Sequence, residues 1–230
     1  MTGRMAGMGG RQAIRAVTDT YSSPIVWIYS KLRFLILRQP FLEEIGQHLP
    51  QRGRVLDIGC GFGLFSLYFA LRSPERRIFG ADIDAQRIDY ATESARKLGL
   101  DNVEYHVISA LDWRDDEPFD AIYMLDLVHH LPRADVRPFL ERVSSSLTPA
   151  GVLILKDVSD RPRWKMWFTL LLDRLMVGRE PIHYWPPEEL AGLLGELGFE
   201  VAHQPMKDFL PYPHMLYVAR RRPAPGSSAR

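Results

Sequence analysis

The sequence has little capacity for covalent cross-linking and no long apolar runs. Its 230 residues include a single cysteine, Cys60, so no disulfide can form within the chain, and a disulfide-stabilised secreted scaffold is excluded. No uninterrupted apolar run reaches about 18 residues, and the N-terminus has no compact apolar core of a secretion signal. With 46% hydrophobic residues, a chain of this length can bury a core unaided. The sequence therefore predicts a cytoplasmic globular domain.

The chain also has almost no net charge, but its charges are unevenly distributed. The formal net charge is +1. Residues 1–38 carry six Lys/Arg and one acid, residues 39–160 carry 13 Lys/Arg and 20 acids, and residues 161–179 carry five Lys/Arg and one acid. The whole-chain charge gives no indication of nucleic-acid binding, whereas the two basic segments require an explanation of their own.

Short apolar runs alternate with helical patterns between these segments. Such alternation predicts an α/β fold in which a mostly parallel sheet carries helices on both faces. The expected strands cover 54–59, 77–82, 103–108, 119–125, 151–156, 201–204 and 215–220, and the expected helices cover 64–71, 85–98, 133–147 and 187–197. Parallel sheets of this kind bind ligands beyond the carboxyl ends of their strands. Residues at strand ends are therefore the candidates for function.

A glycine-rich turn follows the first expected strand. Glycines at 59, 61 and 63 allow a sharp turn and let a ligand approach the backbone. Leu64 stands where a dinucleotide fingerprint needs glycine, and no Lys-Ser/Thr pair follows as in a phosphate-binding loop. Asp57, at the entrance of the turn, would repel a pyrophosphate and suits a ligand with positive charge.

A carboxylate also ends the second expected strand. Asp82 lies 25 positions beyond Asp57, where an acid can accept hydrogen bonds from both hydroxyls of a ribose. The two acids and the glycines together predict a site for an adenosine with a cationic tail that lacks phosphate.

Four segments in this order resemble the class I S-adenosylmethionine-dependent methyltransferases. They are Asp57-Ile-Gly-Cys-Gly-Phe-Gly63, Gly80-Ala-Asp-Ile-Asp84, Phe119-Asp120 with Leu127-Val-His-His-Leu131, and Leu147-Thr-Pro-Ala-Gly-Val-Leu-Ile-Leu155. The resemblance covers roughly residues 50–205. It implies a Rossmann-like, doubly wound seven-stranded sheet of order 3-2-1-4-5-7-6, with the seventh strand antiparallel. It also implies S-adenosyl-L-methionine as the cofactor.

The resemblance assigns cofactor-binding roles to the strand ends. It places Asp57 near the amino group of the methionine part, Asp82 at the ribose and Ile83 on the adenine ring. Ser109 stands where many relatives have Asp at the adenine edge, and Asp112 is a substitute at a different offset. The full set of expected cofactor residues is Asp57, Gly59, Cys60, Gly61, Gly63, Asp82, Ile83, Ser109, Ala110, Leu125 and Asp126.

Two histidines follow the fourth expected strand. Methyl transfer needs a base only where the acceptor must lose a proton, and histidine suits that role near neutral pH. His130 is the preferred candidate because it matches the more regular histidine of the family, and His129 is the second. The alternative is that both belong to a turn that packs on the cofactor. Asp157 and the pair His183-Tyr184 are weaker candidates. No set of residues has the spacing of a metal site.

The two basic segments, 24–38 and 161–179, are also apolar and aromatic. In relatives, insertions at these places form a lid over the acceptor, and Trp and Phe beside Lys and Arg equally suit a membrane surface. The expected organisation is a flexible N-terminus at 1–20, a helical lid segment at 21–50, the methyltransferase domain at 51–220 with a lid insertion at 161–186, and a disordered tail at 221–230.

The sequence thus predicts methyl transfer to a small, hydrophobic or lipid-like acceptor. We expect a cytoplasmic enzyme with a peripheral contact to the inner membrane face, and no nucleic-acid partner. Two alternatives stay open: a methyltransferase acting on RNA or protein, and a non-catalytic cofactor-binding subunit.

Overall fold

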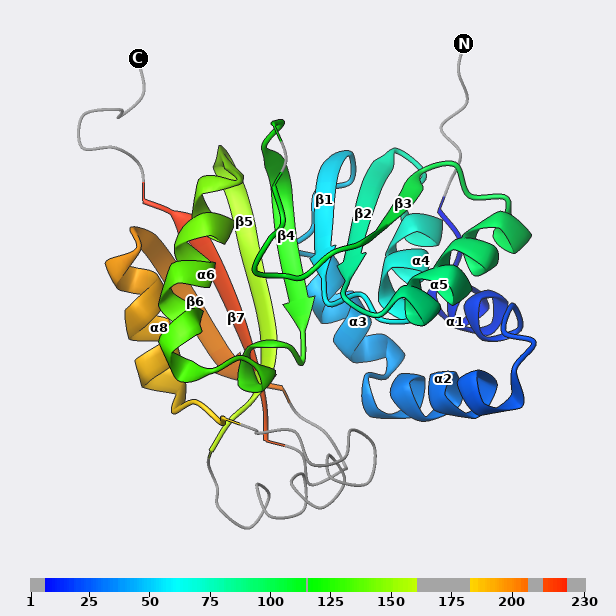
Figure 1. Cartoon of the computed structure of the whole chain (residues 1–230), viewed down its shortest axis with the longest axis horizontal. Coiled ribbons are helices and arrows are strands. Elements are labelled where there is room, and N and C mark those ends of the chain that lie inside the picture. The colour runs from blue at the N-terminus through cyan, green and yellow to red at the C-terminus, as the bar shows by residue number, and fades with distance from the viewer. Residues whose placement is uncertain (1–6, 115, 161–182, 207–212, 223–230) are drawn as a thin grey trace. The chain divides into compact units, whose positions relative to one another are not determined.

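A computed structural model describes residues 7–114, 116–160, 183–206 and 213–222. The chain divides into two compact units, Met1–Leu125 and Asp126–Arg230. Their elements can be followed by label in Figure 1, and each unit is considered by itself.

The first unit is built on four parallel strands. Its strand order is β3-β2-β1-β4, with every neighbouring pair parallel. The central strand β1 buries Val55, Leu56 and Ile58, as its continuous apolar run predicts. The strands are β1 (Gly53–Ile58), β2 (Arg76–Asp82), β3 (Val103–Val107) and β4 (Phe119–Leu125). Because the strands are parallel, the residues that follow β1, β2 and β3 gather at one edge of the sheet.

Two helices connect these strands, and their ends have local causes. Helix α4 (Leu64–Arg72) starts after Gly63 and ends where Ser73 turns extended before a proline. Helix α5 (Ala85–Leu98) begins at Asp84, whose carboxylate accepts hydrogen bonds from the backbone N–H groups of Gln86 and Arg87. It ends at Gly99, whose φ of 65° is left-handed. Both helices pack on β2 and β3, and their bounds match the sequence prediction within one residue.

Three further helices precede β1 in the first unit. They are α1 (Gly10–Thr18), α2 (Pro24–Ile36) and α3 (Gln39–Gly46). The sequence predicted a flexible segment as far as residue 20, but residues 10–18 are helical, and Ala13 and Val17 are fully buried. These two side chains lie one turn apart on α1, and α1 packs against α4. Two apolar residues among glycines and arginines are too short a pattern to be recognised in the sequence.

The second unit combines helices with an antiparallel set of strands. Strand β7 (His214–Arg221) pairs antiparallel with both β5 (Leu147–Val158) and β6 (Phe199–Pro205). A short 3-10 helix, η1 (Val128–His130), precedes α6 (Arg133–Ser145), and α8 (Pro187–Glu196) packs on β6 and β7. Strand β5 begins at Leu147, four residues before the predicted start, because residues 147–150 continue its extended backbone.

The strands form one sheet of order β3-β2-β1-β4-β5-β7-β6. This order and the antiparallel β7 confirm the predicted α/β fold class. Among the described residues, no helix has the length and apolar character needed to cross a bilayer.

Candidate functional site

The turn between β1 and α4 keeps its backbone open on one side. Gly59, Gly61 and Gly63 have φ values of 76°, 54° and 77°, which L side chains rarely adopt. A Cβ on Gly63 would lie 2.6 Å from Tyr105 Oη and 2.7 Å from Ala91 Cβ, whereas a Cβ on Gly61 would meet nothing within 4 Å. Gly63 is therefore required by internal packing, while Gly61 borders free space that a ligand can enter.

Asp82 joins this turn to the end of β2. Its Oδ2 accepts a hydrogen bond of 2.8 Å from the N–H of Gly61, and its Oδ1 accepts one of 3.0 Å from the N–H of Asp84. The residue is 9% exposed, whereas the next side chain, Ile83, is 75% exposed. A largely buried carboxylate at the end of the strand and an exposed apolar side chain beside it suit a ribose and a flat ring, respectively.

Asp57 is a buried acid that lies behind the glycine turn. Tyr123 Oη donates a hydrogen bond of 2.8 Å to Asp57 Oδ2. Burial raises the pKa of Asp57 to about 7, and the negative charge of Asp82 contributes in the same direction, against hydrogen bonds from Tyr123 and Ser66 that lower it. Because the pKa of Asp57 lies near neutral pH, a cation placed beside the carboxyl group would favour its charged form.

Cys60 lies in the same turn and is buried. Burial, with Asp57 and Asp82 nearby, raises the pKa of its thiol well above the ordinary value. The thiolate is the reactive form of cysteine, so Cys60 is unsuited to act as a nucleophile.

The segment after β3 forms a compact turn. Ser109 Oγ accepts a hydrogen bond of 3.2 Å from the N–H of Leu111, and the carbonyl of Ser109 accepts one of 2.9 Å from the N–H of Asp112. Ser109 and Ala110 are half-buried, and Asp112 is exposed. Leu125, the last residue of β4, is buried. The first unit thus gathers most of the predicted cofactor residues around one sheet edge.

Asp126 opens the second unit with a strained backbone. Its φ of 62° is left-handed, which is unusual for a residue with a side chain. Its carboxylate pairs with the ammonium of Lys156, whose side chain is fully buried, and its N–H donates a hydrogen bond of 2.8 Å to the carbonyl of Lys156. These two contacts fix the strained residue to β5. Backbone strain of this kind is enriched at functional sites.

Asp157 clamps the histidine turn to the same strand. Its Oδ1 is in hydrogen-bond contact with Nδ1 of His129, and its Oδ2 accepts a hydrogen bond of 3.1 Å from the N–H of His129. Asp157 and His129 are both almost fully buried. A carboxylate at Nδ1 fixes the orientation and the tautomer of the ring, which leaves Nε2 as the proton-accepting atom.

His130 is the more accessible of the two histidines. It is half-buried, and its ring centroid lies 4.1 Å from that of His129. On the other side, the ring of Tyr184 stacks on His129 at 6.0 Å, and the N–H of His183 donates to the carbonyl of His129 at 2.8 Å. The five polar residues predicted at these positions, including Asp157, therefore form one cluster, in which His130, His183 and Tyr184 are half-buried and His129 and Asp157 are buried.

Asp126, His129 and Asp157 also have ligand atoms within 4.8 Å of one another. Their polar atoms are engaged by the protein, since Lys156 contacts Asp126 and the N–H of Val158 donates to Asp157 at 2.7 Å. A buried ammonium supplies the positive charge that the carboxylates need. The cluster is accordingly a hydrogen-bonded network of side chains.

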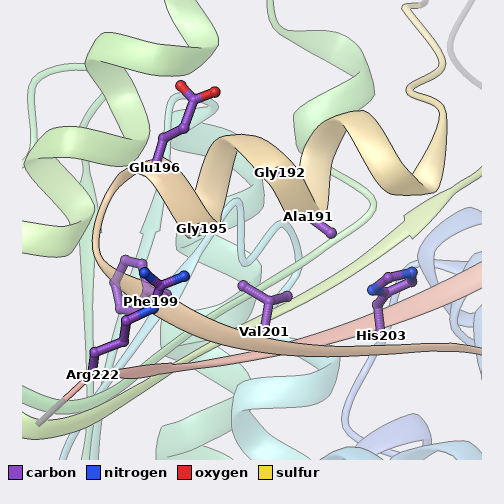
Figure 2. A pocket seen from close by; sticks show the side chains of 8 residues that line it. All are labelled: Ala191, Gly192, Gly195, Glu196, Phe199, Val201, His203 and Arg222. Atoms are coloured by element: carbon purple, nitrogen blue, oxygen red, sulfur yellow. The ribbon is translucent and has the colours of Figure 1, made fainter.

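A separate hollow of about 490 Å³ lies on the second unit. Figure 2 shows it between α8 and β6, with Glu196 pointing away from the strand and the side chains of Phe199, Val201 and His203 along it. It contains no residue from the strand ends at which function was predicted, and its lining is mostly small or apolar. The hollow is not part of the site described above.

Sequence reasoning passed over Tyr123 and Lys156. Both occur inside strand-forming apolar runs, where a polar side chain is costly unless it has a buried partner. That signal identifies them as residues with a partner, but only the fold reveals that Tyr123 serves Asp57 and Lys156 serves Asp126.

A model of a family described as "Methyltransferase domain" matches residues 30–204. The chain is 33% identical over 181 residues to a ubiquinone biosynthesis O-methyltransferase from Azorhizobium caulinodans, covering 73% of this chain and 67% of the relative. It is 26% identical over 169 residues to the enzyme of the same name from Neisseria meningitidis, covering 70% of each chain.

Among solved structures, the fold is similar to that of magnesium protoporphyrin IX methyltransferase from Synechocystis PCC 6803, determined with bound S-adenosylhomocysteine (SAH). The TM-score is 0.66 at 17% identity, and the match covers 92% of this chain and 95% of the other. At this identity the likeness concerns the fold alone.

Proposed function

Because the chain belongs to the class I S-adenosylmethionine-dependent methyltransferases, we propose that it methylates a small, apolar or lipid-like acceptor. The observation that supports the cofactor site most directly is the glycine turn at 59–63. There Gly61 borders open space, and its N–H donates a hydrogen bond to Asp82. The proposed acceptor site is the histidine cluster after β4, where His130 is half-buried and His129 is buried.

The residues of the first unit fit the cofactor of this family. Asp82 would accept hydrogen bonds from the ribose, and Ile83, which is exposed and apolar, would cover the adenine ring. Asp57, with its pKa near 7, would ionise beside the amino group. The methionine part would be bordered by Gly59, Cys60, Gly61 and Gly63, the adenine edge by Ser109 and Ala110, and the reacting end by Leu125. The resemblance also assigns the reacting end to Asp126, the next residue in the chain and the first of the second unit. When bound, S-adenosylmethionine supplies a methyl group that is already activated as a sulfonium.

His130 is the proposed base for acceptors that must lose a proton. Its half-buried ring lies against His129, which Asp157 holds in one orientation. His129 itself is almost fully buried, so it is the second choice for direct contact with an acceptor. A base held by packed neighbours can take a proton without reorganisation of the turn.

The apolar character of the acceptor is supported by the first unit and by the relatives. Helix α2 exposes large apolar side chains, and the relatives named above act in ubiquinone biosynthesis. We propose that residues 24–38 contact a membrane surface at the cytoplasmic face. The second basic segment proposed for this contact, 161–179, belongs to residues 161–182, which lie outside the described part of the chain.

Transfer of a labelled methyl group into a cell extract tests the proposed acceptor class. Purified protein, labelled S-adenosylmethionine and extract are incubated, and label is counted separately in lipid, water-soluble small-molecule, RNA and protein fractions. Label in the lipid or apolar small-molecule fraction supports the proposal. Label in RNA or protein favours the macromolecular alternative, and SAH binding without any label favours a non-catalytic subunit.

A further inference from the structure

Helix α2 has an exposed face that is apolar along its whole length. Ile25, Ile28, Leu32 and Leu35 follow one another at intervals of three or four residues and are between 46 and 80% exposed, and Trp27 adjoins them. This spacing places the four side chains in one stripe along the helix. A soluble protein rarely leaves so many large apolar side chains together without a binding role.

The charges around this stripe have a single sign. Residues 24–38 contain Lys31, Arg33 and Arg38 and no acid. Lys31 Nζ lies 5.1 Å from the ring centroid of Trp27, so an aromatic ring and a cation meet at the edge of the stripe. Apolar side chains flanked by cations and a tryptophan suit a surface of acyl chains beneath anionic headgroups. A nucleic-acid backbone would offer nothing to the apolar stripe.

Beside this stripe, α2 also contacts the glycine turn. The ring of Tyr29 lies 5.1 Å from the ring of Phe62, which stands between Gly61 and Gly63. Just before α2, Tyr21 Oη donates a hydrogen bond of 2.8 Å to the carbonyl of Phe62. The segment that carries the exposed stripe therefore holds the turn at which the cofactor is proposed to bind.

We propose that α2 docks on an anionic lipid surface and that docking and cofactor binding strengthen each other through Tyr29 and Phe62. The coupling rests on the proposed function, since it assumes that the turn binds cofactor. Docking fixes α2 and with it the ring of Tyr29, which restrains the glycine turn in one conformation. A turn that is already ordered loses less freedom when it binds a ligand. Linkage requires the two affinities to change by the same factor.

Vesicle flotation tests the docking half. Full-length protein is floated with vesicles of phosphatidylglycerol mixed into phosphatidylcholine, and with phosphatidylcholine alone. We expect flotation with the anionic vesicles, weaker flotation at high salt, and loss of flotation in Ile28→Ser/Leu32→Ser and in Lys31→Glu. Arg11→Glu and Val107→Ser are the matched controls and should float as wild type, because Arg11 on α1 and Val107 on β3 are exposed residues outside the stripe. No flotation, or equal flotation of the stripe variants, overturns the proposal.

Titration of SAH with and without the same vesicles tests the coupling. We expect vesicles to tighten SAH binding about five-fold or more, and SAH to tighten vesicle binding by the same factor. Tyr29→Ala should still float but should lose the vesicle effect on SAH affinity. Flotation without any change in SAH affinity overturns the coupling. Failure of wild type to bind SAH under all conditions would instead contradict the proposed function. Thermal unfolding of each variant verifies that it is folded.

Discussion

At the scale of single residues, the proposed cofactor site contains a buried acid, Asp57, whose pKa lies near neutral pH. The pKa of Asp57 is raised to about 7 chiefly by burial. The apolar run around Asp57 predicts a buried strand, but the partner of its carboxylate cannot be read from the sequence, because that partner lies on a strand distant in the chain. Tyr123 on β4 contacts Asp57 across 66 positions of sequence.

A pKa of about 7 at Asp57 predicts that SAH affinity depends on pH. Below pH 7 Asp57 is mostly neutral, and above it the carboxylate can attract the amino group of the ligand. We expect calorimetry to find binding about ten-fold tighter at pH 8 than at pH 6. Asp57→Asn should bind more weakly at pH 8 and should show a flatter profile. An unchanged profile in this variant would place the titrating group elsewhere.

The same shift predicts the direction of a stability change. The native pKa of Asp57 lies above the unfolded value of 3.8, so the native state binds the proton more tightly. The stabilisation is complete below about pH 4 and is lost as pH rises to about 7, by roughly 2–4 kcal/mol. Urea unfolding at pH 5 and pH 8 should therefore show a smaller difference for Asp57→Asn than for wild type.

Two glycines with left-handed backbones provide a matched pair. Gly99→Ala has open space around its new Cβ, so it should cost only the backbone strain of about 1–2 kcal/mol. Gly63→Ala adds contacts with Tyr105 and Ala91 and should cost about 2–4 kcal/mol. Urea unfolding measures the loss of unfolding free energy in both variants. Equal losses would show that Tyr105 and Ala91 can shift away from the new Cβ without cost.

At the scale of elements, the histidine turn is held by one strand end. Strand β5 ends with Lys156, Asp157 and Val158, and the first two contact Asp126 and His129. The clamp therefore positions η1, and with it His130, relative to the end of β5. The bonds from Asp157 add a fixed polar attachment to the packing of Val128, which is buried.

This arrangement predicts distinct effects of three substitutions on turnover. His130→Ala should lower kcat at least 100-fold for an acceptor that loses a proton, and Asp157→Asn should lower it about 10- to 100-fold by releasing His129. His183→Ala keeps the backbone hydrogen bond to His129 and should retain near wild-type kcat. SAH affinity should be similar in all three. Normal turnover of His130→Ala would exclude this residue as the base.

The elements themselves were largely predictable, and their partnerships were not. Apolar runs and glycine or proline stops predicted all seven strands and helices α4, α5, α6 and α8, since these signals are local. Helix α1 escaped because its buried face consists of little more than Ala13 and Val17. The pairing of Lys156 with Asp126 depends on strands adjoining in space, which no local pattern encodes.

At the scale of the whole molecule, the net charge of +1 is the sum of an acidic middle and basic segments with different proposed roles. The acidic middle of the chain contains the strand ends proposed to bind a cationic ligand, and the basic segment 24–38 contains the exposed stripe of α2. The apolar face and its cations occupy a helix that also touches the glycine turn. Donor binding and surface binding can therefore be separated by mutation, even though we propose that they are linked.

Tyr21→Phe tests that link without altering the stripe. The change removes the hydrogen bond to the carbonyl of Phe62 and leaves the ring in place. We expect a loss of stability of about 1 kcal/mol and weaker SAH binding, with vesicle flotation unchanged. Unaltered SAH affinity, measured by calorimetry, would mean that the N-terminal segment does not support the turn.

The central claim is that the glycine turn and Asp82 form the cofactor site. Calorimetric titration of SAH into wild type, Asp82→Ala and Asp89→Ala tests it most directly, because Asp89 is an exposed carboxylate on nearby α5. Wild type and Asp89→Ala should bind SAH equally, and Asp82→Ala should lose at least ten-fold in affinity while remaining folded. Equal affinity of a folded Asp82→Ala variant would contradict the account.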